Sequence, residues 1–133
     1  MLFGQEHVDR YVETDGAERH DWQGTTVLIL TTTGRRSGQR RSTPLIYGQD
    51  GDAYLVVASN NGADEPPGWY RNLEADSEAE VQVKDDRFTA RARTATPAEK
   101  PRLWQTMTGK WSAYDEYQHK TEREIPVVVL DRA

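Results

Sequence analysis

A cluster of cationic and hydroxyl side chains follows the most apolar stretch in the first half of the chain. Residues 28–33 (LILTTT) lead into residues 34–38 (GRRSG), and a second basic cluster, residues 40–43 (RRST), comes shortly after. Glycine accepts positive φ and lets an anionic group approach the backbone, and arginine binds phosphate or carboxylate through paired hydrogen bonds. The pattern predicts a loop that binds a phosphorylated or polycarboxylate ligand. A solvent-exposed turn without function is the alternative that these residues leave open.

Other catalytic motifs are missing from the sequence. The basic stretch lacks the Lys-Ser/Thr pair of a P-loop and the G-x-G-x-x-G of a dinucleotide-binding turn. The three histidines, His7, His20 and His119, are scattered and form no H-E-x-x-H pattern, so we expect no metal site. The absence of cysteine excludes thiol nucleophiles and disulfides, and no G-x-S-x-G elbow supports a serine triad.

Length and charge restrict the class of protein. The 133 residues suit a single domain spanning 1–133 with a short N-terminal helix. The net charge of −5 argues against a nucleic-acid binder, whereas a local basic cluster suits a small anionic ligand. No signal peptide pattern and no apolar run of about 20 residues is present. We therefore expect a cytoplasmic protein without stable membrane insertion; peripheral membrane contact and the oligomeric state are left open.

Periodicity and turn signals predict a mainly β fold with short helices. Apolar stripes and capping signals indicate helices over residues 5–13, 69–75, 97–107 (ended by Gly109) and 112–119. Alternation and β-branched runs indicate strands over residues 25–33, 43–47, 54–58, 80–84, 88–94 and 125–130. About six antiparallel strands in hairpins fit a barrel with helices over its openings. A doubly wound sheet does not fit, because β-helix-β alternation is missing.

Aromatic residues gather in two segments that could border a ring-shaped ligand. Trp69 and Tyr70 lie in one segment, and Trp111, Tyr114 and Tyr117 lie in the other. For Trp69 alone, ordinary packing is the preferred interpretation. Tyr114 and Tyr117 stand in an otherwise polar segment, which is typical of a pocket wall or lid.

Several of these stretches together resemble one family. Residues 31–38 (TTTGRRSG), Pro44-Leu45, Ala58-Ser59, residues 69–73 (WYRNL) and Tyr114 before the terminal IPVVV are similar to the deazaflavin-dependent nitroreductases, the A-type group of coenzyme F420-dependent oxidoreductases. The resemblance runs from about residue 7 to residue 130. It implies a split β-barrel of the FMN-binding split-barrel type, with coenzyme F420 in a groove across it.

The resemblance also implies a set of coenzyme-binding residues. The phosphate and the start of the oligoglutamate tail would be bound by Arg35, Arg36 and Ser37. The ribityl chain and the ring would follow Arg41, Ser42, Thr43, Pro44, Leu45 and Ile46. The deazaflavin would contact the backbone of Val57, Ala58, Ser59 and Asn60, with another side closed by Gly68, Trp69, Tyr70, Arg71 and Asn72. Tyr114 would face the ring. Two residues depart from the family pattern: Asn60 stands where lysine is common, and Ile46 replaces an aromatic residue.

The implied activity is transfer of a hydride from the reduced deazaflavin to an electron-poor acceptor: a quinone, an activated alkene or a nitroaromatic. Tyr114 or Tyr117 would donate a hydrogen bond or a proton to the acceptor. The residues leave two alternatives, because barrels of this type hold varied ligands. One is a non-catalytic binder of F420, haem or a fatty acid, and the other is an FMN-dependent reductase.

Overall fold

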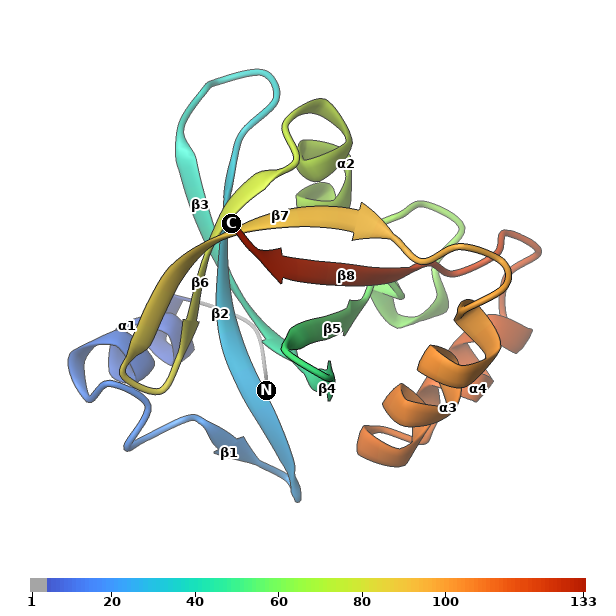
Figure 1. Ribbon diagram of the computed structural model, residues 1–133, viewed down its shortest axis with the longest axis horizontal. Coiled ribbons are helices and arrows are strands. Elements are labelled where there is room, and N and C mark those ends of the chain that lie inside the picture. The colour runs from blue at the N-terminus through green and yellow to red at the C-terminus, as the bar shows by residue number, and fades with distance from the viewer. Residues whose placement is uncertain (1–4) are drawn as a thin grey trace.

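The computed structural model describes residues 5–133, which form eight strands, four α-helices and one 3-10 helix (Figure 1). The first half contains α1 (Gln5–Glu13), β1 (Asp21–Trp22), β2 (Thr25–Thr33), β3 (Arg40–Ile46), β4 (Gly48–Asp50), β5 (Ala53–Val57) and the 3-10 helix η1 (Asn60–Gly62). The second half contains α2 (Gly68–Ala75), β6 (Glu78–Val83), β7 (Asp86–Thr94), α3 (Lys100–Lys110), α4 (Ala113–His119) and β8 (Val127–Arg132). In this described part of the chain, every helix is too short or too polar to cross a bilayer.

Most predicted elements are present, with three corrections. The structure has eight strands where about six were predicted, because β1 and β4 are only two and three residues long and carry too little pattern to be recognised. Gly109 does not end the third helix, since α3 continues to Lys110. The two hydrogen bonds of the predicted capping box are present, since the Thr96 amide donates to Glu99 Oε1 at 2.8 Å and the Glu99 amide donates to Thr96 Oγ1 at 3.3 Å. The start of the third helix was wrong, because α3 begins at Lys100 and residues 97–99 form a turn before it.

Every strand pair is antiparallel, and the sheet curls into a split barrel. The strand order is β1-β2-β6-β7-β8-β5-β4, and β3 pairs with the other edge of β2. Because β3 continues through Tyr47 into β4, which pairs with β5, one bent segment connects the two ends of the sheet. Among the described residues β3 pairs along its own length only with β2, so a gap remains between β3 and β5.

The bend between β3 and β4 is held by hydrogen bonds at Tyr47. Its amide donates to the Thr26 carbonyl at 3.1 Å, and its hydroxyl lies 2.9 Å from Nε2 of His20. The other ring nitrogen of His20 lies 2.8 Å from Asp21 Oδ1. Burial raises the pKa of Tyr47, so this hydroxyl stays protonated at neutral pH. The position where the two halves of the bent strand diverge is therefore fixed.

The β2–β3 hairpin determines where the basic residues lie. Val27 pairs with Ile46 at one end, and Thr33 pairs with Arg40 at the other. The loop of residues 34–39 closes this hairpin beside the N-terminal end of α2 (Figure 1). The nine residues of β2 extend about 30 Å at the usual rise of a strand, so the basic loop and β1 lie at opposite ends of it.

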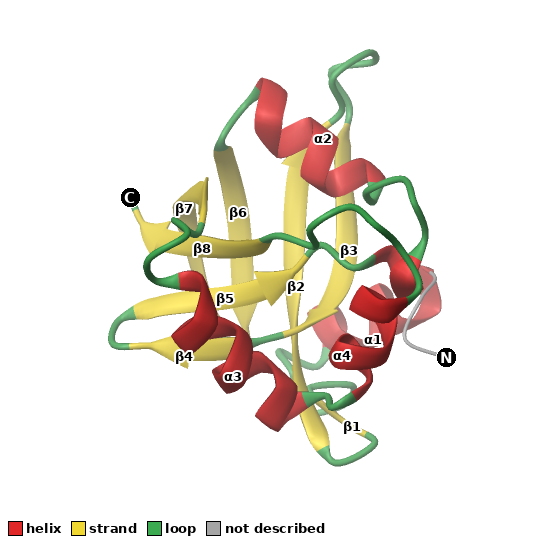
Figure 2. Cartoon of the chain, turned by 90° about the vertical axis from the view of Figure 1, so that its right-hand side faces the viewer, coloured by secondary structure: helices red, strands yellow, loops and turns green. Residues whose placement is uncertain are grey.

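The barrel strands bury side chains on both faces. Leu28, Leu30 and Val56 belong to one apolar cluster, which also holds Trp69 and Leu73 of α2. This cluster joins β2, β5, β6, β7 and β8, so it fills the barrel interior, and α2 covers one of its ends. The alternate residues of β2, β5 and β8 form the second cluster under α1, α3 and α4. Figure 2 shows α3 lying across β4 and β5 and α2 above the barrel.

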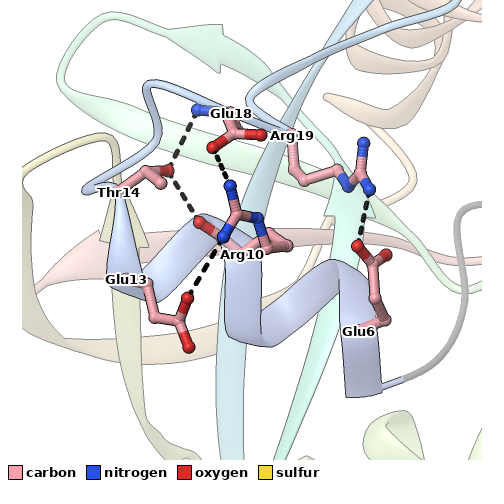
Figure 3. Close-up of polar contacts among 6 residues, drawn as sticks. All are labelled: Glu6, Arg10, Glu13, Thr14, Glu18 and Arg19. Atoms are coloured by element: carbon pink, nitrogen blue, oxygen red, sulfur yellow. Dashed lines mark hydrogen bonds and ion pairs between the residues drawn. The ribbon is translucent and has the colours of Figure 1, made fainter.

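Helix α1 is fastened to the barrel at its C-terminal end and carries a set of surface ion pairs. Arg10 pairs with Glu13 and Glu18, and Arg19 pairs with Glu6 (Figure 3). These pairs are exposed and each contributes little to stability. The stronger anchor is the fully buried Tyr11, whose hydroxyl accepts a hydrogen bond from the Lys84 amide at 2.8 Å. Burial raises the pKa of Tyr11 to about 12.

Candidate functional site

A continuous groove runs along the gap between β3 and β5. It consists of two hollows, of about 560 Å³ and about 470 Å³, that share Thr43, Gly68 and Trp69. We call the first the aromatic cleft and the second the anion pocket. Thr43 comes from β3, whereas Gly68 and Trp69 form the first turn of α2. The two hollows therefore meet where the barrel edge approaches α2.

The anion pocket is formed by the basic loop, the end of β3 and α2. It is lined by Thr32, Gly34, Arg35, Arg36, Ser37, Arg41 and Asn72 in addition to the three shared residues. The loop is a tight turn in which the Gly34 amide donates to the Gln39 carbonyl and the Gly38 amide to the Gly34 carbonyl, each at 2.8 Å. Gly38 has φ +70°, a conformation that favours glycine.

Two arginines of the anion pocket are free to bind a ligand. Arg36 and Arg41 are exposed, and within residues 5–133 neither forms an ion pair. Their neighbour Arg40 differs, because its Nη1 donates to Thr33 Oγ1 at 2.8 Å and its Nη2 lies 3.9 Å from Glu80. Free guanidinium groups beside a glycine-bounded turn suit a phosphate or a carboxylate.

Asn72 connects the basic loop to α2 and to β2. Its Oδ1 accepts hydrogen bonds from the amide of Arg35 at 3.2 Å and from Nη1 of Arg35 at 2.9 Å. Its Nδ2 donates to the buried hydroxyl of Thr32 at 3.1 Å. The side chain of Arg35 is thus held against α2, which makes it part of the scaffold of the pocket as well as a source of charge.

The aromatic cleft lies further along the groove. Besides the shared residues it is lined by Trp22, Leu45, Ile46, Val57, Ser59, Asn60, Asn61, Pro66, Pro67, Trp111, Tyr114 and Tyr117. The rings of Trp22 and Trp111 pack with centroids 5.3 Å apart, and those of Tyr114 and Tyr117 with centroids 6.1 Å apart. A cleft with apolar and aromatic walls and few polar groups suits a planar ligand.

Tyr114 is the most deeply buried aromatic side chain of the cleft, with 5% of its surface exposed. Burial raises the pKa of its hydroxyl above the usual value, with a smaller contribution from Tyr117. Within residues 5–133, none of the hydrogen bonds involves this hydroxyl. It therefore remains protonated at neutral pH and is available as a hydrogen-bond donor to a ligand.

The structure brings most of the predicted coenzyme residues to the groove. The members of that set that line it are Arg35, Arg36, Ser37, Arg41, Thr43, Leu45, Ile46, Val57, Ser59, Asn60, Gly68, Trp69, Asn72 and Tyr114, and Tyr117 joins them. The remaining five, Ser42, Pro44, Ala58, Tyr70 and Arg71, do not line either hollow.

Local contacts explain why these five residues lie elsewhere. On β3, alternate side chains point to opposite faces, so Ser42 lies 2.7 Å from the Thr31 hydroxyl and Pro44 is buried. The Tyr70 hydroxyl lies 2.9 Å from Thr94 Oγ1, and Arg71 pairs with Glu65. Ala58 is fully buried, which leaves only its backbone for the predicted contact.

The segment after β5 has an unusual backbone. Asn60 and Asn61 have φ of 47° and 56°, which is the left-handed region that asparagine tolerates better than most residues. Nδ2 of Asn60 donates to the carbonyl of Glu65 at 2.9 Å. Asn60, which stands where the resemblance predicts a lysine, thus stabilises its own loop and adds no charge to the groove.

Some lining residues were not predicted from the sequence. Trp22, Asn61, Pro66 and Pro67 border the aromatic cleft, and Trp111 was predicted only as aromatic surface near a pocket. The Pro66-Pro67-Gly68 break next to an aromatic helix is a signal that could have indicated a cleft wall. Trp22 carries no such signal, because its position depends on contact with Trp111, 89 residues further along the chain.

Comparisons with known proteins identify the family of this chain. The family model described as F420H2-dependent quinone reductase matches residues 3–132. An F420H2-dependent quinone reductase of Mycobacterium tuberculosis (strain H37Rv) is 43% identical over 126 residues, covering 92% of this chain and 85% of the relative.

Solved structures show the same fold. One described as an F420-H2-dependent reductase has a TM-score of 0.74 and 34% identity, covering 79% of this chain and 93% of that chain. Another, described as a domain-swapped dimer, has a TM-score of 0.77 and 33% identity, covering 96% of each chain. A haem-binding protein from Mycobacterium smegmatis, 19% identical, shares the fold with a TM-score of 0.62. On the family match and the 43% identity, this chain belongs to the F420H2-dependent quinone reductase family.

Proposed function

We propose that this protein reduces a quinone with a hydride taken from reduced coenzyme F420. The observation that carries the proposal is the continuity of the anion pocket with the aromatic cleft through Thr43, Gly68 and Trp69. F420 is an elongated molecule with a planar deazaflavin at one end and a phosphate and acidic tail at the other. A groove with free arginines at one end and aromatic walls at the other fits both parts.

The residues of the groove suit the coenzyme in a definite order. Arg36, Ser37 and Arg41 would bind the phosphate and the acidic tail, because their donors border the anion pocket and the two arginines are unpaired within residues 5–133. Leu45 and Val57 would pack on the ring from β3 and β5. Arg35 would act mainly through its contact with Asn72, which positions the loop.

When bound, the deazaflavin supplies a hydride from its C5 carbon. The role of the protein is then to hold the acceptor against the ring, to keep water away and to stabilise the charge that develops on the acceptor oxygen. Tyr114 suits the last task, since it lines the cleft and its hydroxyl has no hydrogen-bond partner within residues 5–133. Its raised pKa makes it a stable hydrogen-bond donor rather than a strong acid. A solvent proton would complete the hydroquinone.

An anaerobic titration tests this function. Purified protein is titrated with F420 while the coenzyme fluorescence is followed, and reduced F420 is then mixed with a panel of quinones, activated alkenes and nitroaromatics. We expect saturable binding of F420 and fastest oxidation with quinones. Saturable binding without oxidation on the whole panel would support a non-catalytic binder instead. Stoichiometric binding of FMN in place of F420 would overturn the assignment of the coenzyme.

The wider acceptor range and the cellular location belong to the same proposal. Activated alkenes and nitroaromatics are included because the cleft has few polar groups that would select one acceptor head group. A cytoplasmic location is also proposed, and the lack of cysteine is compatible with the reducing conditions there. Cell fractionation with an antibody against the protein would test this location.

A further inference from the structure

Arg123, in the segment between α4 and β8, binds three backbone carbonyl groups of the loop that follows β5. Its Nη2 donates to the Ala58 carbonyl at 3.2 Å and to the Ser59 carbonyl at 3.0 Å. Its Nε donates to the Ala63 carbonyl at 2.9 Å. Within residues 5–133 Arg123 takes part in none of the ion pairs, so these carbonyl groups are the partners of its charge.

These bonds fix the direction of two peptide units. In a planar trans peptide the C=O and the N–H point in opposite directions. Because the Ala58 and Ser59 carbonyls point to Arg123, the amides of Ser59 and Asn60 point away from it. Neither amide donates any of the hydrogen bonds found within residues 5–133. Ser59 and Asn60 border the aromatic cleft, whereas Arg123 borders a separate hollow with Asp64 and His119.

We propose that Arg123 is a positioning residue for the coenzyme ring. By holding the Ala58 and Ser59 carbonyls, it presents the Ser59 and Asn60 amides to the cleft as hydrogen-bond donors for the carbonyl oxygens of the deazaflavin. The inference rests on the proposed function, because it needs the ring to lie in the aromatic cleft. It assigns a role to a side chain that does not touch the ring.

The Ser59 carbonyl also accepts the Gly62 amide at 2.9 Å, within the same loop. Two further attachments of the loop do not involve the Ala58 or Ser59 carbonyls. Thr121 Oγ1 donates to Asp64 Oδ1 at 2.7 Å. Gly62 packs on α4 so closely that a Cβ there would lie 2.8 Å from the Tyr117 carbonyl oxygen. Loss of the Thr121–Asp64 bond therefore loosens the same loop without releasing the Ala58 and Ser59 carbonyls. Asp64→Ala is the matched control.

The test compares Arg123→Met, Arg123→Lys and Asp64→Ala with the unchanged protein. The methionine keeps an apolar stem and removes the guanidinium, and the lysine keeps the charge and a compact set of donors. The measurements are the Kd for F420, the absorption spectrum of the coenzyme at saturation, and kcat and KM for a quinone. Thermal melts check folding, and the lysine variant carries the test if Arg123→Met does not fold.

We expect Arg123→Met to raise the Kd for F420 about tenfold or more, as for the loss of one to two hydrogen bonds. The spectrum of the bound coenzyme should shift toward that of free F420, and kcat should fall while KM for the quinone changes little. Arg123→Lys should recover part of the affinity and of the spectral shift. Asp64→Ala should keep the Kd within about twofold and leave the spectrum unchanged, because its lost contact involves exposed groups.

Each contrary outcome has a defined meaning. An Arg123→Met protein that keeps the Kd and the bound spectrum, or an Asp64→Ala protein that changes both equally, overturns the positioning role. If the unchanged protein binds F420 but reduces no acceptor, the proposed reaction fails, while the spectra still decide the role of Arg123. If the unchanged protein does not bind F420, both proposals fall.

Discussion

Adjacent arginines on β3 offer a sharp test of the anion pocket. Arg41 borders the pocket without an ion pair in the described residues, whereas Arg40 is engaged by Thr33 and Glu80 outside it. Exchange of either for alanine removes one positive charge from almost the same place in the sequence. The two variants therefore have the same net charge and differ in whether the lost guanidinium could touch the coenzyme.

The expected size of the effect follows from exposure. A hydrogen bond to a charged group contributes about 1.5–3 kcal/mol, but Arg41 is open to solvent, and screening reduces the contribution to about 1–2 kcal/mol. Arg41→Ala should then raise the Kd for F420 roughly 5- to 30-fold. Arg40→Ala should change it less than about threefold, through the long-range field alone. Arg36→Ala should resemble Arg41→Ala.

Fluorescence titrations at low and high salt measure this difference. The ratio between the Kd values of Arg41→Ala and the unchanged protein should shrink as ionic strength rises, because salt screens exposed charges. Equal affinities of the Arg40→Ala and Arg41→Ala proteins would refute the reasoning. They would mean that the basic residues act as a diffuse positive field rather than as contacts.

Three further predictions concern groups elsewhere in the structure. Tyr114→Phe should lower kcat with little change in the Kd for F420, and an equal loss of kcat and affinity would indicate that Tyr114 only packs. Because burial raises the pKa of Tyr114, kcat of the unchanged protein should show no tyrosine ionisation between pH 6 and 9. Asn72→Ala should lower the free energy of unfolding by about 1–3 kcal/mol in urea titrations, since it leaves the buried Thr32 hydroxyl and the Arg35 amide unpaired. Asn72→Asp should recover part of this loss. An unchanged unfolding midpoint would contradict these hydrogen bonds. Burial lowers the pKa of His7 below 6.5, so its neutral ring stabilises the fold fully above pH 6.5, and this stabilisation is lost as the pH falls toward the lower folded-state pKa. His7→Gln should therefore make the free energy of unfolding depend less steeply on pH in that window. An unchanged slope would exclude His7 as the cause.

The sequence was most informative where local chemistry and family resemblance agreed. The strand of residues 25–33 and the glycine-bounded basic loop after it were predicted because β-branched residues and glycine have strong local preferences. The resemblance did not separate the side chains of β3 by the face of the strand on which they lie. All residues 41–46 were assigned to the coenzyme, whereas Ser42 and Pro44 line neither hollow; Ile46, which shares their face by alternation, lines the aromatic cleft from the last position of the strand.

Features that depend on distant contacts could not be predicted in this way. Trp22 enters the cleft through packing on Trp111, and Arg123 acquires its role through carbonyl groups about 60 residues earlier in the chain. A single sequence contains no local pattern for either contact. The low helix propensity of Gly109 predicted a helix end, and α3 extends only one residue past it, to Lys110.

The open edge of β3 has a consequence for the stability of the whole protein. Between Arg40 and Ile46 this strand pairs on one side only with another strand of residues 5–133, and the groove occupies the other side. A molecule lying there would take the place of a missing strand and cover an edge that otherwise invites pairing with other chains. Bound coenzyme should therefore raise the melting temperature as its concentration exceeds its Kd, and it should also slow aggregation.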